Sequence, residues 1–392
     1  MTPYYDTDFN LLRWLQGHDY KLDIIVPKLR NHLLFRRSAW DLDNYAKKKR
    51  DHPIHAHWKS GLTGRAVLTP NAVVNIEQTG SNDYTGLLRS YTGLEILKAR
   101  LYDLELMLKA VMDLEAETGE QASILYVMDL ENLKFDKNLL GLITGPLSSV
   151  ATIMSEHYVE LIHTFVLVHV PTFISTLWAL ARPLLPEKTR NKVKIFGSNW
   201  REEVVKIAVP ETLPTFWNEP GEDVSKKANY TLSDHIQLSL LFFLVSRSKN
   251  WCNYLFFFCF LKLFKAPVER AVPYDPANYI DKTAILENME VTAVPPGKTL
   301  LIPGYGTKGQ VMHWKVDADG NFGLCLYFTE DENETDLDKM RPKIPGPTVV
   351  PIEDTVICDS TGFYKLWFSN AHAWFHTLKL HYSQVFQDAP AN

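Results

Sequence analysis

Residues 155–200 read SEHYVELIHTFVLVHVPTFISTLWALARPLLPEKTRNKVKIFGSNW and contain the pattern that decides the fold. Phe165–Val168 is a continuous apolar run, which is typical of a strand buried on both faces of a sheet. A helical segment follows Pro171 and stops at Pro183, and Val193–Phe196 forms a second short apolar run. A strand, a covering helix and another strand in this order predict an α/β layered domain with a largely parallel sheet.

The chain before this stretch continues the same alternation. Leucines recur every three or four residues from Leu87 to Glu117, which predicts one long helix that ends at Gly119. Ile124–Met128 is another continuous apolar run and predicts a further buried strand. Shorter segments predict helices over 11–15, 22–34 and 139–154, and strands over 66–68 and 73–76.

The chain after Lys265 has a different texture. Short alternating segments at 299–302, 311–316 and 324–328 are separated by glycine, proline and acidic turns. Such a succession is typical of an antiparallel β-sandwich. The sequence therefore predicts an α/β domain followed by an all-β domain.

Composition excludes several classes of protein. The 392-residue chain carries a net charge of -5, which argues against a dedicated nucleic-acid binder, whose surface is usually basic. Its basic run, Lys47–Arg50, is typical of a solvated helix end. The 4 cysteines have no zinc-ligand spacing and are too few for a disulfide framework. Because the first residues contain no secretory signal, we expect a cytoplasmic protein.

The motifs that resemble catalytic or metal sites all lack an essential part. Gly304–Gly309 fits the letters of the dinucleotide fingerprint, but a strand-like segment follows it in place of a helix. His157, His163 and His169 recur every six residues without an acidic or thiol partner at ligand spacing. No nucleophile motif is present. We therefore expect no catalytic residues, no metal and no enzymatic activity.

Several strings in the α/β part resemble the CRAL-TRIO family. The resemblance covers about 190 residues and implies an α/β lipid-binding domain with short N-terminal helices, a mostly parallel sheet and a gate helix. Asn132 stands where the family often has glycine, and asparagine can also adopt the left-handed backbone conformation. The matching strings are Leu11–Leu15, Met128–Leu133, Glu156–Glu160, Phe165–Phe173, Ala181–Leu185 and Phe196–Trp200.

Two strings in the all-β part resemble a GOLD domain, namely Trp314–Gly320 and Gly362–Asn370. CRAL-TRIO followed by GOLD resembles the supernatant-protein-factor and tocopherol-associated group. The domain organisation that follows is an N-terminal helical remnant at 1–50, a CRAL-TRIO domain at 51–228, an apolar insert at 229–267 and a GOLD jelly-roll sandwich at 268–388. Since helices that normally precede Leu11 are missing, we expect the start to be truncated.

The resemblance also implies the binding residues. The segment 172–184 corresponds to the gate helix. Glu160 and Arg182 correspond to residues that bind a phosphoinositide headgroup in yeast phosphatidylinositol-transfer relatives. Two alternatives predict the same residues: a core helix packed on the sheet, and a surface ion pair between Glu160 and Arg182. The implied gate and pocket residues are Phe173, Ile174, Leu177, Trp178 and Leu180.

The insert at 229–267 departs from the family. Ile236–Val245 and Tyr254–Phe264 are intensely apolar, yet each is shorter than the ~20 residues that span a bilayer. One interpretation is an interfacial membrane anchor. The alternative is translated intron sequence, since family-like sequence stops at Gln237 and resumes near Val268.

The function that the resemblance implies is binding and transfer, or presentation, of a hydrophobic lipid such as a phosphoinositide, tocopherol or squalene. The alternative is a lipid-sensing adaptor in vesicle trafficking that acts through the GOLD domain. No cofactor is expected besides the bound lipid. The expected partners are a phospholipid or isoprenoid-type lipid, a transient membrane surface at which the protein is peripheral, and a protein bound by the GOLD domain, but no nucleic acid.

Overall fold

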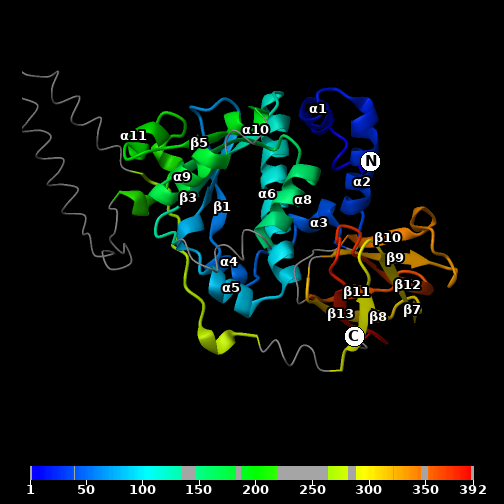
Figure 1. Cartoon of the computed structure of the whole chain (residues 1–392). Helices are drawn as coiled ribbons and strands as arrows, with labels where there is room; N and C mark the ends of the chain where they lie inside the picture. Colours follow the sequence, from blue (N-terminus) through cyan, green and yellow to red (C-terminus); the bar gives the residue numbers. More distant parts are fainter. Residues whose placement is uncertain are drawn as a thin grey trace, which may run out of the picture.

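The computed structural model describes residues 2–38, 40–134, 146–181, 187–218, 264–280, 288–320, 322–345 and 352–389. Figure 1 shows one body of helices around a sheet and a second body made of strands. Most of the predicted insert at 229–267, and with it the choice between anchor and intron sequence, lies outside the described residues.

Four helices precede the first strand. They are α1 (Asp8–Gly17), α2 (Leu22–Arg36), α3 (Leu42–Tyr45) and α4 (Ile54–His57). Thr7 caps α1, because its side chain accepts a hydrogen bond of 3.2 Å from the backbone N–H of Asn10. The two helices predicted at the start are therefore present as α1 and α2.

The predicted helix over 87–117 is divided in two, α5 (Tyr84–Ser90) and α6 (Gly93–Thr118). Thr92 begins α6 with a capping box, in which its side chain accepts from the N–H of Glu95 while the Glu95 carboxylate accepts from the N–H of Thr92. The helix ends at Gly119, whose φ of 70° is left-handed. Leucine periodicity continues across the break, which is why the sequence predicts one helix.

The sheet of the first body has the order β1-β2-β3-β4-β5. β2, β3, β4 and β5 are parallel, and β1 is antiparallel to β2. The sheet is therefore largely parallel, as predicted. The strands are β1 (Ser60–Arg65), β2 (Ala72–Glu77), β3 (Ser123–Asp129), β4 (Ile162–Val168) and β5 (Val193–Ile195).

The strand predicted over 66–68 is wrong. These residues form a tight turn in which the N–H of Leu68 donates to the carbonyl of Ala66 at 2.8 Å, and Val67 has a φ of 63°. The strand lies just before it, at Ser60–Arg65, where two glycines and few apolar side chains hide its pattern. This strand forms because it pairs with β2, and its own sequence lacks the alternation that would predict it.

Helices cover both faces of the sheet. Ile124 and Tyr126 of β3 pack into the cluster that contains the apolar side of α6. Leu125 and Val127 point the other way, toward Trp200 of α11 (Trp200–Val204). The remaining helices of this body are α8 (Pro146–His157), α9 (Thr172–Ala181) and α10 (Glu187–Lys192), with short 3-10 helices at Thr79–Ser81, Pro210–Thr212 and Thr215–Trp217.

The second body contains two four-stranded antiparallel sheets, with the orders β10-β9-β12-β7 and β11-β8-β13-β6. Trp314, Tyr364 and Phe368 are buried within it. The predicted antiparallel all-β domain is therefore present. Its strands are β6 (Glu290–Val294), β7 (Thr299–Gly306), β8 (Val311–Ala318), β9 (Gly323–Thr329), β10 (Arg341–Pro345), β11 (Ile352–Ile357), β12 (Gly362–Ser369) and β13 (Leu378–Gln387), with 3-10 helices at Pro276–Asn278 and Leu337–Lys339.

Candidate functional site

Glu160 lies between α8 and β4, at the edge where the parallel strands begin. Its backbone φ is 55°, which is uncommon for a residue other than glycine and marks a position held by its surroundings. The Lys192 ammonium at the end of α10 donates to the Glu160 carboxylate at 2.8 Å and to the carbonyl of Ile162 at 3.1 Å. The two side chains are 22% and 25% exposed, so the pair is largely enclosed yet reachable from solvent.

Other basic groups surround this pair. His163 is the second residue of β4, and Lys194 lies within β5. Burial lowers the pKa of His163, and the positive charges of Lys194 and Lys192 lower it further. Among the described residues, this edge of the sheet therefore places the Glu160 carboxylate beside the Lys192 ammonium, with Lys194 near His163. Such a set suits a ligand that carries both a phosphate for the ammonium groups and hydroxyls for the carboxylate.

The end of α1 closes on the same place. A Cβ on Gly17 would lie 2.1 Å from Cγ1 of Val159 and 3.4 Å from Cγ of Glu160. A distance of 2.1 Å is far below van der Waals contact, so only glycine lets α1 approach this loop. Gly17 is thus a packing requirement of the loop that carries Glu160.

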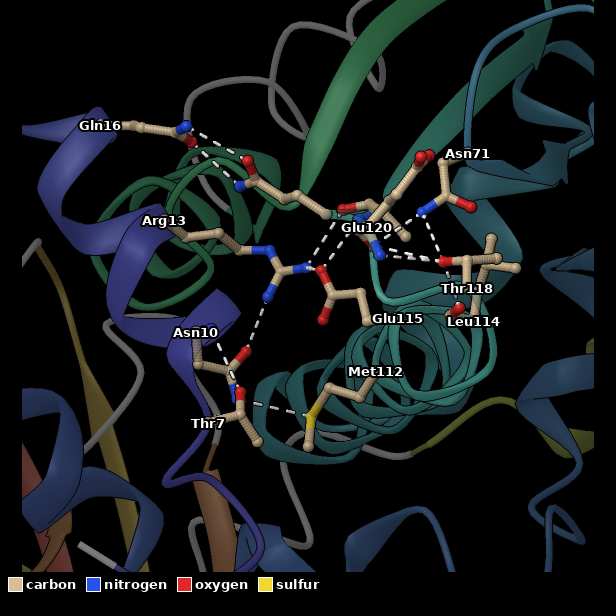
Figure 2. A network of polar contacts seen from close by, with 12 residues as sticks. Thr7, Asn10, Arg13, Gln16, Asn71, Met112, Leu114, Glu115, Thr118 and Glu120 are labelled. Atoms are coloured by element: carbon tan, nitrogen blue, oxygen red, sulfur yellow. Dashed lines mark hydrogen bonds and ion pairs between the residues drawn. The ribbon is translucent and has the colours of Figure 1, made fainter.

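Polar contacts hold α1 in that position, and Figure 2 shows the Arg13 side chain between Asn10 and Glu115, which lies near the end of α6. The Arg13 guanidinium donates to Asn10 at 2.7 Å, to the carbonyl of Ala122 at 3.1 Å and to the Glu115 carboxylate. One turn later, Gln16 exchanges two amide hydrogen bonds with the side chain of Gln121. These hydrogen bonds of Arg13 and Gln16 therefore tie α1 to the turn that leads into β3.

A second set of polar contacts, made by α2 and α6, holds the loop that carries Glu160. Arg36 of α2 forms a two-pronged ion pair with the buried Glu105 of α6, with both N–O distances at 2.9 Å. The hydroxyl of Tyr158 donates to the same carboxylate at 2.7 Å. Burial raises the pKa of Glu105, whereas the Arg36 charge lowers it. Since Tyr158 lies two residues before Glu160, α2 and α6 both position the loop.

The residues of α9 lie only partly buried. Phe173, Ile174 and Trp178 are half-buried, and no α9 side chain within the described part of the chain is fully buried. Phe173 packs beside a cluster that includes Trp58 and Tyr84. The side chains of Leu177 and Leu180 lie outside the description. α9 thus presents apolar side chains that are less enclosed than those of a core helix.

The opposite edge of the sheet, where the parallel strands end, carries a separate polar group. The Asp129 carboxylate accepts from Trp217 at 2.6 Å and contacts Nδ1 of His169 at 2.8 Å, while Glu131 pairs with Arg270 at 3.2 Å. The ligand atoms of Asp129, Glu131 and His169 lie within 4.8 Å of one another. Spacing along the chain missed these acidic partners of His169 because they come from the neighbouring strand.

This second group is best explained as a structural brace. Each of its carboxylates already has a protein donor, and the contacts link β3 and β4 to the segments after α11 and after Phe264.

The turn at Asn132 has a φ of 67°, which confirms the prediction that asparagine adopts the left-handed conformation there.

The sequence of this body matches a known family of domains. Residues 66–218 fit the model of the CRAL/TRIO domain. Residues 66–218 therefore form a CRAL/TRIO domain. Residues 277–391 fit a second family, described as F28H7_8_C-like, C-terminal domain. The predicted CRAL-TRIO resemblance is confirmed, whereas the GOLD resemblance of the C-terminal domain stays a prediction.

Three curated relatives share parts of the chain. CRAL-TRIO domain-containing protein F28H7.8 of Caenorhabditis elegans is 32% identical over 220 residues, which are 54% of this chain and 52% of the relative. Protein ctg-1 of the same organism is 21% identical over 390 residues, 97% of this chain and 92% of the relative. Phosphatidylinositol/phosphatidylcholine transfer protein SFH11 of Arabidopsis thaliana is 23% identical over 231 residues, 58% and 52% of the two chains.

The chain spans about half the length of the first and third of these relatives. Among solved structures, the crystal structure of Sfh5 overlaps 50% of this chain and 68% of its own, at 20% identity and a TM-score of 0.41. Within the described residues, no helix of the chain is both long and apolar enough to cross a membrane.

The CRAL/TRIO domain places the predicted site residues as follows. Glu160 is at the strand edge, but Arg182, its expected partner, lies outside the described residues. The described partner of Glu160 is Lys192, which sequence reasoning missed. A signal for it exists: Lys192 directly precedes β5, which is parallel to β4, and parallel strands bring their first residues to the same edge. His157, His163 and His169 are spread over α8, β4 and the turn after it.

Proposed function

We propose that the CRAL/TRIO domain binds a lipid and transfers or presents it, with the polar headgroup at Glu160 and Lys192 and the acyl chains against α9. The observation that carries this proposal is the largely enclosed ion pair between Glu160 and Lys192. Glu160 has a left-handed backbone conformation, and the contacts of α1 and α2 described above hold its loop in place. The name of the Arabidopsis relative, phosphatidylinositol/phosphatidylcholine transfer protein, favours a phospholipid.

The proposed division between headgroup and chains follows from elementary energetics. Burying an acyl chain stabilises binding by ~0.8 kcal/mol per CH₂, so a two-chain lipid does not leave a closed pocket for water. Release then needs an apolar surface that opens only against a membrane. The half-buried Phe173, Ile174 and Trp178 of α9 suit such a gate, and Leu177 and Leu180 belong to the same proposed surface.

The lysine of the pair is the sharpest test of this proposal. Lys192→Ala removes the ammonium that would meet a phosphate, so we expect a ~10- to 100-fold loss of affinity for phosphatidylinositol. Tocopherol and squalene, which have no phosphate, should bind as before. Transfer of fluorescent phosphatidylinositol between vesicles, beside binding of tritiated tocopherol, measures both effects. Arg182→Ala is expected to act in the same direction.

Lys206→Ala is the matched control, because Lys206, two residues after the end of α11, forms a surface ion pair with Glu203. It should leave binding of both ligands unchanged. An equal loss of phosphatidylinositol and tocopherol binding in Lys192→Ala would contradict the headgroup role. Binding without faster exchange between vesicles would favour the lipid-sensing adaptor, with the C-terminal domain, proposed to be GOLD-like, as its interaction module.

A further inference from the structure

The loop between β12 and β13 exposes two large aromatic side chains. Trp374 is 86% exposed and Phe375 is 92% exposed, the two highest values among the large hydrophobic side chains of the described residues. Single exposed apolar residues are common on protein surfaces, but here two large rings follow one another directly in one loop. Such exposure costs free energy in water unless the rings have a partner.

The loop is held firmly at its base, so the rings are presented in a defined place. The buried Asn370 donates from its side chain to the carbonyls of Val294 at 2.9 Å and His376 at 2.8 Å. Its backbone N–H donates to the carbonyl of Lys298 at 2.9 Å, and its carbonyl accepts from the N–H of Gly297 at 3.0 Å. These bonds fix the first end of the loop to the β6–β7 turn and tie its other end, at His376, to Asn370. A fixed base lowers the entropy lost when the tip binds.

The surroundings of the tip are polar and mostly basic. Lys298 and Lys379 are exposed beside the base of the loop. The nearby acidic residue is Asp319, which contacts the His376 ring at 3.1 Å and accepts from the backbone N–H of Lys379 at 2.9 Å. Two exposed lysines thus lie at the base of the loop that carries the aromatic rings, while the carboxylate of Asp319 already has partners. This arrangement is complementary to a negatively charged surface.

The size of the patch distinguishes a membrane from a protein partner. Each aromatic side chain offers ~150–250 Å², so the two rings together supply well under the ~800 Å² per partner of a stable protein interface. The polar residues around them do not extend the apolar area. A bilayer needs no complementary surface, since aromatic rings enter the headgroup layer directly and basic residues meet anionic lipids.

We propose that Trp374 and Phe375 form a membrane-docking tip that enters the headgroup layer of an anionic bilayer, with Lys298 and Lys379 against the lipid phosphates. This docking role extends the proposed lipid transfer. It rests on that proposal only because a lipid carrier has to contact membranes. Docking brings the protein to the bilayer through its C-terminal domain, separately from the lipid held in the CRAL/TRIO domain.

The test is sedimentation of the full chain with vesicles of phosphatidylcholine, with and without phosphatidylserine. The variant Trp374→Ala/Phe375→Ala should fold normally, because both rings are almost fully exposed. We expect its apparent dissociation constant for vesicles with phosphatidylserine to rise at least ~tenfold. Lys298→Gln/Lys379→Gln should remove the preference for phosphatidylserine while keeping weak binding. In the wild type, a blue shift of tryptophan emission on vesicle addition should disappear with Trp374→Ala.

Ile357→Ala is the matched control, since Ile357 is 71% exposed on β11 of the same domain. It should bind vesicles like the wild type. Failure of the wild type to bind phosphatidylserine vesicles, or unchanged binding by the double aromatic variant, would overturn the docking tip. If vesicles are bound but no lipid is extracted from them, the carrier function fails and the docking tip stands.

Discussion

At the scale of single residues, two backbone positions shape the candidate site. Glu160 takes a left-handed conformation, and Gly17 lets α1 approach the loop that carries it. Neither role is visible in the local sequence, because each depends on a neighbour far along the chain. Even a substitution that adds a single methyl group at these positions should therefore disturb the packing of the loop.

Gly17→Ala is expected to destabilise the protein by about 1–3 kcal/mol, because the new methyl group would overlap Cγ1 of the stiff Val159 side chain. Urea unfolding followed by circular dichroism measures the loss. Gly61→Ala is the control, since nothing lies within 4 Å of a Cβ placed there. Adding Val159→Ala to Gly17→Ala should recover part of the stability. A Gly17→Ala protein as stable as the wild type would contradict the close approach.

At the scale of elements, α2 and α8 meet through two buried histidines. Nδ1 of His32 lies 3.3 Å from Nδ1 of His157, and Phe35 and Arg36 line the same contact. Burial, together with the positive charges of Arg36 and Lys28, lowers the pKa of His157 to about 4. Burial also holds the pKa of His32 well below its usual range. Both rings are therefore neutral at pH 7.

A pH dependence of stability follows from this pair. Because the folded pKa values are lowered, the unfolded chain binds protons that the folded chain refuses once the pH falls below ~6.5. Stability should be full above that pH and fall by up to ~1.4 kcal/mol per histidine per pH unit on the way down to about pH 4. Urea midpoints at several pH values measure the slope.

His157→Gln removes one titrating group from the contact and should flatten that slope. His372→Gln is the matched control, because His372 is exposed in the β12–β13 loop, and it should leave the slope unchanged. A wild-type midpoint that does not move between pH 7 and pH 5 would show that the two rings gain protons as easily in the folded chain as in the unfolded one.

At the scale of the whole molecule, the two domains meet along α6 and β11. The Lys98 ammonium of α6 lies 2.7 Å from the Asp354 carboxylate of β11. The Asp354 side chain is only 11% exposed, and one of its oxygens is buried without a described hydrogen-bond donor. The lysine is therefore the described counter-charge of a largely enclosed carboxylate at the contact between domains.

A double-mutant cycle with Lys98→Ala and Asp354→Ala should give a coupling energy of about 1 kcal/mol, reduced by the partial exposure of Lys98. The Lys109–Asp113 pair on the exposed side of α6 should give less than ~0.5 kcal/mol. Calorimetry of Lys98→Ala should also separate the unfolding of the two domains more widely. Equal coupling in both pairs would show that the domain contact is not energetically special.

Sequence alone determined the elements whose signal is local. Continuous apolar runs located β3 and β4, the segment after Pro171 located α9, and alternation located β7, β8 and β9. Asn132 also behaves as its residue type predicts. These features follow from side-chain periodicity and from the backbone preferences of single residues, and both are written in neighbouring positions.

Only the tertiary structure decided β1 and the partner of Glu160. β1 forms because it pairs with β2. The break before α6, by contrast, has a local signal in the capping box of Thr92 and Glu95, which the leucine periodicity hid. Lys192 meets Glu160 because parallel strands bring distant residues to one edge of the sheet. Pairings of this kind depend on distances in space, which the order of residues along the chain does not specify.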